Sequence, residues 1–152
     1  MKRLPFLLAT LFALALLPGR AEAQFAVGGR AKMLLPTGDF DDVAKTGWGA
    51  AATGDFTLVP LIKLRGEVGY NRFDGETDGE TTYDDWNIWN FGIGARLQLP
   101  IVYISLDGSY YTKIDEFSVL PGIGARILFL DVGARYKWTG ENWVEIFGGV
   151  SF

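Results

Sequence analysis

The stretch that decides the fold is the last one, Trp143-Val144-Glu145-Ile146-Phe147-Gly148-Gly149-Val150-Ser151-Phe152. Side chains alternate between two faces along a β-strand. One face of this stretch therefore carries Val144, Ile146, Val150 and Phe152, and the opposite face carries Trp143, Glu145, Phe147 and Ser151. The pattern predicts a strand with a lipid-like environment on one side and a packed polar interior on the other.

The same two-residue alternation recurs along the chain, whereas no helical stripe of apolar residues is found after the first 23 residues. It predicts eight strands, at about 25–35, 47–58, 61–72, 86–99, 101–113, 117–127, 130–138 and 143–152. Short apolar turns and longer polar loops join them alternately. This asymmetry is typical of an antiparallel up-and-down transmembrane β-barrel, with short periplasmic turns and longer external loops.

The first residues have the composition of a secretory signal peptide. Met1-Lys2-Arg3 is basic, the run from Leu4 to Leu17 is apolar, and Ala21-Glu22-Ala23 is a small-residue cleavage site. The apolar run is shorter than the about 20 residues of a transmembrane helix. We therefore expect a signal peptide at 1–23, cleavage after Ala23, and one exported barrel domain at 24–152.

Composition limits the possible functions of the exported part. It keeps 11 of the 14 basic and 17 of the 18 acidic residues, a formal charge of −6 that argues against nucleic-acid binding. The chain has no cysteine and no histidine, which excludes disulfides, His-based catalytic triads and His-rich metal sites. We expect no enzymatic activity, no catalytic residue, no metal and no cofactor.

Charge predicts which face of the strands points inward. Turned toward lipid, a single Arg or Lys at mid-depth would cost about 2–4 kcal/mol, whereas basic and acidic groups can pair inside a barrel. The predicted interior charge network consists of Arg30, Lys32, Asp55, Lys63, Arg65, Glu67, Arg96, Asp107, Lys113, Arg126, Asp131, Arg135, Lys137 and Glu145. Inward glycines such as Gly94 and Gly124 would make room for these long side chains. A soluble lipocalin-like barrel, with polar residues outward, is the alternative.

The other acidic residues of the exported part fall in or beside the longer loops, which we expect outside the cell. Asp74, Glu76, Asp78 and Glu80 alternate there as possible cation contacts, without the spacing of an EF-hand. Aromatic residues near the strand ends suggest two interfacial girdles. The girdle predicted at the loops contains Trp48, Tyr70, Phe73, Trp86, Trp89, Tyr110, Phe117, Tyr136, Trp138 and Trp143, and the one at the turns contains Phe25, Phe56, Phe129 and Phe152.

With its signal peptide, eight alternating strands and terminal Phe152, the chain resembles the small eight-stranded bacterial outer-membrane barrels, the OmpX-like and OmpA-barrel-like proteins. The resemblance implies an outer-membrane location. It also implies that the assembly machinery reads the last strand, through Val144, Ile146, Val150 and Phe152. Lipid and lipopolysaccharide would surround the barrel, and a loop partner is not identified. The terminal strand should pair with both the strand at 130–138 and the one at 25–35, which closes the sheet.

The expected function is therefore a non-enzymatic surface or structural role, with a lumen filled by side chains. The sequence also allows three alternative functions. These are a narrow ion-conducting pore, a soluble lipocalin-like carrier, and a lipid-modifying membrane enzyme, although no general base is visible for the serines.

Overall fold

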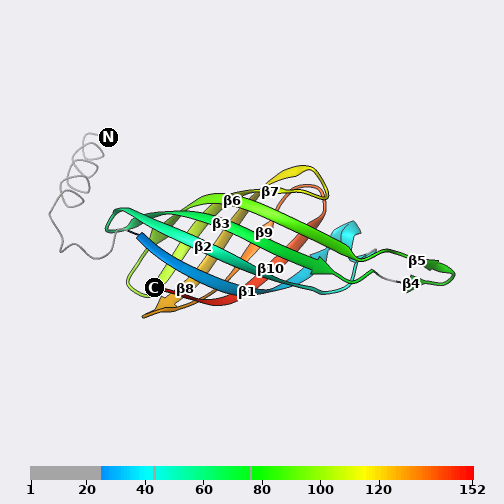
Figure 1. Ribbon diagram of the computed structural model, residues 1–152, viewed down its shortest axis with the longest axis horizontal. Coiled ribbons are helices and arrows are strands. Elements are labelled where there is room, and N and C mark those ends of the chain that lie inside the picture. Colours follow the sequence, from blue (N-terminus) through cyan, green and yellow to red (C-terminus); the bar gives the residue numbers. More distant parts are fainter. Residues whose placement is uncertain (1–24, 43, 76) are drawn as a thin grey trace, which may run out of the picture.

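Ten strands and one short helix make up the computed structural model, which describes residues 25–42, 44–75 and 77–152 (Figure 1). The signal peptide expected at 1–23 lies outside the described residues. The elements are β1 (Phe25–Thr37), the 3-10 helix η1 (Gly38–Asp42), β2 (Gly47–Val59), β3 (Ile62–Phe73), β4 (Thr77–Asp78), β5 (Thr81–Thr82), β6 (Trp86–Gln98), β7 (Val102–Tyr111), β8 (Glu116–Ile127), β9 (Leu130–Lys137) and β10 (Asn142–Ser151).

Eight of these strands form a closed antiparallel barrel in the order β1-β10-β9-β8-β7-β6-β3-β2. The seam lies between the first and last strands, whose paired register runs from Gly28–Ser151 to Thr37–Asn142. β10 also pairs with β9. The predicted closure by the terminal strand is thereby confirmed, and the barrel has no free sheet edge.

Alternation of side chains gives the barrel two distinct surfaces. In β6, Trp89, Phe91 and Ile93 are exposed, whereas Asn90 and Arg96 are buried. The remaining barrel strands follow the same rule, so bulky apolar side chains cover the outside and most charged side chains of the strands point inward.

The two ends of the barrel differ. At one end, called the turn end, residues 60–61, 99–101 and 128–129 connect the strands, and both β1 and β10 reach it (Figure 1). At the other end, called the loop end, the connections are 38–46, 74–85, 112–115 and 138–141. No helix among the described residues is long and apolar enough to cross a membrane.

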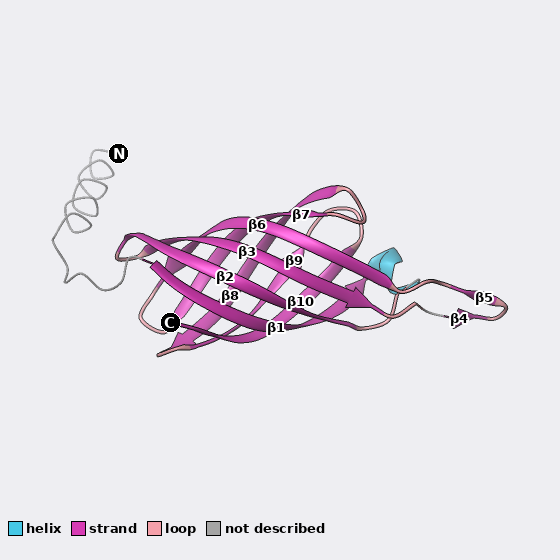
Figure 2. Cartoon of the chain, in the orientation of Figure 1, coloured by secondary structure: helices cyan, strands magenta, loops and turns pink. Residues whose placement is uncertain are grey.

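The structure departs from the sequence prediction at several element ends. β1 continues through Pro36. Its pairing with β2 ends at Leu34, and beyond that residue β1 pairs only with β10. Proline is tolerated there, because a strand that is paired on one side only does not need a hydrogen-bond donor on the other. The acidic loop contains the hairpin β4–β5, which extends beyond the barrel (Figure 2). β7 ends at Tyr111, two residues earlier than expected.

Candidate functional site: the barrel interior and its closed mouth

A cluster of charged side chains fills the interior near the turn end. Arg65 holds Asp55 with two parallel bonds, Nε to Oδ1 at 2.6 Å and Nη2 to Oδ2 at 2.7 Å. Asp131 accepts from Arg96 at 3.1 Å and from the Tyr103 hydroxyl at 2.6 Å. The Arg96 guanidinium also lies 3.5 Å from the centre of the Tyr103 ring. Together with Arg126, which lies 3.4 Å from Asp55, these residues form the turn-end cluster.

A second cluster lies farther along the barrel and is centred on Glu67. Its carboxylate accepts from Lys32 at 2.7 Å and from Arg135 at 2.9 and 3.1 Å. Arg135 also contacts Glu145, and lies 3.3 Å from Asp107. These five residues form the middle cluster. Because they come from β1, β3, β7, β9 and β10, the cluster ties opposite walls of the barrel together.

Neutral polar side chains complete the middle cluster. Asn90 donates to Glu67 at 3.2 Å and to the Ser109 hydroxyl at 3.2 Å. Asn71 in turn donates to the Asn90 carbonyl at 2.9 Å. A buried carboxylate is stabilised when several donors satisfy its lone pairs, so these amides supplement the ion pairs.

Arg30 joins the two clusters. Its guanidinium lies 3.4 Å from Glu67 and 3.7 Å from Asp131, and packs 4.1 Å from the centre of the Phe147 ring. The two clusters with Arg30 contain six basic and five acidic side chains, and each of the five carboxylates contacts at least one cation. Pairing of this kind offsets the large cost of removing charges from water.

Inward glycines provide the room that these side chains occupy. A Cβ atom at Gly94 would collide with the Asp107 carboxylate, and one at Gly124 would collide with the Tyr103 ring. Both glycines belong to the Gly-x-Gly-Ala-Arg segments of β6 and β8. Any larger residue at either position would displace a member of the ion-pair clusters.

Mainly apolar side chains fill the interior at the loop end. Phe40 of η1 is only 3% exposed and inserts between strands, with ring centroids 5.1 Å from Phe73 and 5.9 Å from Trp143. Tyr111 lies 5.2 Å from Trp143 on the other side. The mouth cluster, defined by its buried members, consists of Leu34, Phe40, Ala44, Phe73, Ile88, Tyr111, Leu120 and Trp143. It closes the barrel at the loop end.

A buried lysine fixes the last loop over this mouth. The Lys137 ammonium donates to the Thr139 and Glu141 carbonyls at 2.6 and 2.7 Å, and to the Glu116 carboxylate at 3.1 Å. All three donors of the ammonium are thereby used. It also lies 4.7 Å from the centre of the Trp143 ring. Lys137 therefore belongs with the mouth and not with the two ion-pair clusters.

Comparison with known proteins identifies the fold. No protein-family model matches the chain, and no curated protein sequence matches it. Neisserial surface protein A superposes with a TM-score of 0.48 at 18% identity, over 85% of this chain and 96% of its own. Ail, the attachment invasion locus protein of Yersinia pestis, gives 0.49 at 9% identity, over 84% and 96%.

A de novo designed transmembrane β-barrel superposes with a TM-score of 0.55 at 12% identity, over 84% of this chain and 95% of the designed chain. The chain has the fold of a transmembrane β-barrel. The predicted fold class, a closed eight-stranded antiparallel barrel, is confirmed. The apolar outer surface of this transmembrane barrel agrees with the outer-membrane location expected from the sequence.

The structure brings most of the predicted interior charges together. Arg30, Lys32, Asp55, Arg65, Glu67, Arg96, Asp107, Arg126, Asp131, Arg135 and Glu145 lie in the two clusters or join them. Lys63 stands in register with Arg96 near the turn end and is partly buried. Lys113 was wrongly placed inside. Because β7 ends at Tyr111, Lys113 lies in an exposed turn, where it donates to the Asp85 carbonyl at 3.2 Å.

The girdle predicted at the loop end is partly wrong. Trp48, Trp89 and Trp138 are exposed on the outside, as expected for interfacial aromatics, but Phe73 and Trp143 are fully buried in the mouth cluster. Trp86 is partly buried against the same cluster. Trp143 lies two positions before the inward-pointing Glu145 on the same strand, so its side chain also points inward. The four aromatics predicted at the turn end are all exposed.

Some important residues were not predicted as site residues. Tyr103, Asn90 and Ser109 have the same inward strand parity as the charged residues, so strand parity is the signal that could have identified them. Phe40 lies in a loop and follows no periodicity.

Of the four possible cation contacts, Glu76 lies outside the described residues. Across the described parts of the chain, no three acidic side chains are grouped so that they could hold a metal ion.

Proposed function

We propose that the chain is a non-enzymatic integral outer-membrane protein whose sealed barrel carries acidic external loops. The mouth cluster is the observation that carries this proposal. Phe40 and Trp143 fill the loop end of the barrel with apolar side chains, and paired charges occupy the interior behind them. An ion would have to displace buried aromatic rings and then break ion pairs, so the interior supports a structural role better than a conducting one.

The external loops are the part of the molecule that partners outside the membrane can contact. The hairpin β4–β5 extends farther from the barrel than the other loop-end connections (Figure 2). It is bordered by Asp74, Asp84 and Asp85, with Glu80 at its tip. We propose that Asp74 and Glu80 bind divalent cations shared with the phosphates of neighbouring lipopolysaccharide, through single carboxylates and not through an enclosed metal site.

Conductance in planar bilayers tests the sealed interior. The refolded wild-type barrel should give no stable current steps. A narrow ion pore is the competing function, favoured by the excess of one basic side chain when Arg30 is counted with the two clusters. Large and stable single-channel steps from the wild-type protein would contradict the sealed barrel and support that pore.

Orientation is tested by single cysteines, since the natural chain contains none. In intact cells, Glu80→Cys at the hairpin tip should react with a membrane-impermeant maleimide. Leu128→Cys, at the turn end and 87% exposed, should react only after permeabilisation. The reverse pattern would contradict external loops. Recovery of the protein in the soluble periplasmic fraction would instead support the lipocalin-like alternative.

A further inference from the structure

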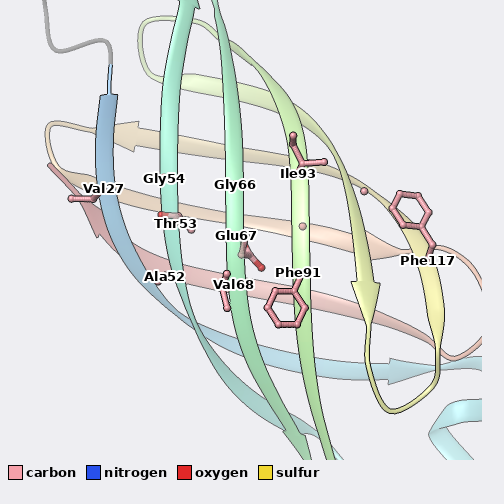
Figure 3. Close-up of a pocket in the computed structure, with 12 residues that line it drawn as sticks. Val27, Ala52, Thr53, Gly54, Gly66, Glu67, Val68, Phe91, Ile93 and Phe117 are labelled. Carbon is pink, nitrogen blue, oxygen red and sulfur yellow. The ribbon is translucent and has the colours of Figure 1, made fainter.

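The outer wall of the barrel has a shallow, open hollow of about 640 Å³. Six consecutive strands, β1, β2, β3, β6, β7 and β8, line it, and Thr53 and Glu67 also contribute to it. Its apolar side chains are Val27, Ala52, Val68, Phe91, Ile93 and Phe117 (Figure 3). All six of these side chains have outward parity. The hollow therefore opens toward the hydrocarbon of the membrane.

Two glycines create the floor of this hollow. Gly54 and Gly66 are direct cross-strand partners, and the same row continues to Val27 on one side and Ile93 on the other. Figure 3 shows both glycines between the side chains of Val27 and Ile93. Two adjacent positions in one row thus lack a side chain, so the wall is recessed there.

Protein packing does not require glycine at either position. A Cβ atom at Gly66 would meet nothing within 4 Å, and one at Gly54 would meet only the Phe25 ring at an ordinary 3.5 Å. Neither glycine has a positive φ, and the β2–β3 register is regular there, with its only shift at Thr57/Val59. Glycine weakens a strand interior, and it often marks a place where a ligand approaches the backbone.

The dimensions of the recess select the ligand. Side chains on one face of a strand are about 7 Å apart and neighbouring strands about 5 Å apart, so the two missing side chains leave a short trough, about 10 Å long and bounded by Val27 and Ile93, that a segment of one hydrocarbon chain can enter. An α-helix, about 10–12 Å in diameter with its side chains, is too wide. The wall of a second barrel is broader still than a helix and could not enter the recess. The trough is also continuous with the lipid-facing surface.

We propose that this hollow is a binding site for one acyl chain of a membrane phospholipid, held more persistently than the lipid around the rest of the barrel. The chain would lie over Gly54 and Gly66, with Val68 and Phe91 as one wall. Strands of such barrels are tilted by about 35–45°, so the row perpendicular to them crosses the membrane obliquely and the bound chain must follow that path. The inference rests on the membrane setting of the proposed function.

Photolabelling tests the site. The protein is refolded into dioleoylphosphatidylcholine vesicles that contain phosphatidylcholine with a diazirine at the end of one acyl chain. After irradiation, peptide mapping should find several-fold more label around Val68 and Phe91 than around Ile123, which lies on β8 outside the hollow and is more exposed than either of them. Equal labelling at the two sites would overturn the proposal, because it would show only ordinary surrounding lipid.

Filling the trough provides the matched comparison. Gly66→Leu, alone or together with Gly54→Leu, should reduce labelling around Val68 to the level around Ile123. Gly148→Leu is the control, since Gly148 is a lipid-facing glycine outside the hollow whose added Cβ would also meet no atom closer than 3.8 Å. It should leave the labelling pattern unchanged.

Three other results would also overturn the proposal. These are equal loss of labelling in the Gly148 variant, retained labelling in the Gly66 variant, and cross-linking of Val68 to a second protein copy instead of lipid. Heat-modifiable migration on a gel monitors folding of every variant. A wild-type chain that does not insert into vesicles would instead contradict the membrane function itself, so the two failures are distinguishable.

Discussion

Arg135 and Glu67 face each other across the full width of the barrel. Arg135 stands on β9 and Glu67 on β3, four strands apart in a closed ring of eight, and Nη2 lies 2.9 and 3.1 Å from the two carboxylate oxygens. One guanidinium nitrogen thus contacts both carboxylate oxygens, and a charged donor and a charged acceptor make such a contact stronger than a neutral hydrogen bond. This pair therefore sets the spacing between opposite walls of the middle cluster.

Glu67→Ala should strongly destabilise the barrel. The substitution leaves Lys32 and Arg135 buried with fewer counter-charges, and removal of one partner of a buried ion pair typically costs about 3–5 kcal/mol. Urea unfolding of the refolded protein, followed by tryptophan fluorescence, measures the change in the free energy of unfolding.

The control for Glu67 is an ion pair at the surface. Asp74→Ala removes the more distant of the two exposed carboxylates that contact Arg72, at 3.5 Å compared with 2.8 Å for Asp85, and should change stability by less than about 1 kcal/mol. Similar small losses in both variants would show that the interior is hydrated enough for water to replace the ion pair.

Phe40→Ala should loosen the mouth without disrupting the ion-pair clusters. The Phe40 ring packs on Phe73, Trp86 and Trp143, and truncation of a buried phenylalanine costs about 3–5 kcal/mol in soluble protein cores. We expect a loss near the lower figure, because the loop can partly follow the missing ring. Tryptophan emission should shift to the red as water reaches Trp143.

Phe117→Ala is the comparison for Phe40. Phe117 lies at the same end of the barrel but is 62% exposed on the outside, so its removal should leave the emission of Trp143 in place. A red shift of equal size in both variants would contradict the view that Phe40 specifically covers the mouth.

Most of the fold follows from strand parity in the sequence. A strand that separates lipid from a polar interior repeats every two residues, so the sequence alone predicts that Arg30, Asp55 and Glu67 point inward. The expected strand ends agree within about two residues with the observed ones. Closure also follows, since an unpaired strand edge in lipid would leave backbone groups without hydrogen bonds.

Strand parity does not predict where the side chains of loops and strand ends point. Phe40 reaches the interior through a 3-10 turn, and nothing periodic in the sequence distinguishes it from its acidic neighbours. The inward prediction for Lys113 fails because the strand ends at Tyr111. The sequence predicts only a polar loop where the hairpin β4–β5 lies. Its two-residue turn is Gly79-Glu80, with glycine at the first central position and φ of 60°, as in a type II′ turn.

The turn between β8 and β9 contains neither glycine nor proline, and the structure shows strain there. Leu128 has φ of 56°, in the left-handed region that costs a residue with a Cβ about 1–2 kcal/mol. Asparagine tolerates this conformation better. Leu128→Asn should therefore raise the free energy of unfolding by about 1 kcal/mol, whereas Leu128→Ala, which keeps the Cβ, should give no gain. Equal effects would locate the change in the exposed side chain and not in the backbone.

Substitution of Phe152 should distinguish an effect on barrel assembly from an effect on barrel stability. Its backbone N–H donates to the Val27 carbonyl at 2.8 Å, and its carbonyl accepts from the Val27 N–H at 2.9 Å, so its backbone closes the seam whatever the side chain. The ring is 75% exposed and stacks on Phe129, with centroids 6.0 Å apart. Phe152→Ala keeps the backbone bonds and should cost only about 1 kcal/mol. If the assembly machinery reads the terminal residue, the amount of folded barrel in the outer membrane should nevertheless fall sharply.

Phe129→Ala removes the other ring of the same stacked pair and leaves the last strand intact. It should match Phe152→Ala in the urea unfolding of purified barrels, because both variants lose one contact between exposed rings. In cells it should reach the outer membrane in normal amounts, as measured by the heat-modifiable band in membrane fractions. Equal yields of the two variants would show that Phe152 acts only through packing at the turn end, since a signal read during assembly must distinguish the terminal residue from its stacking partner.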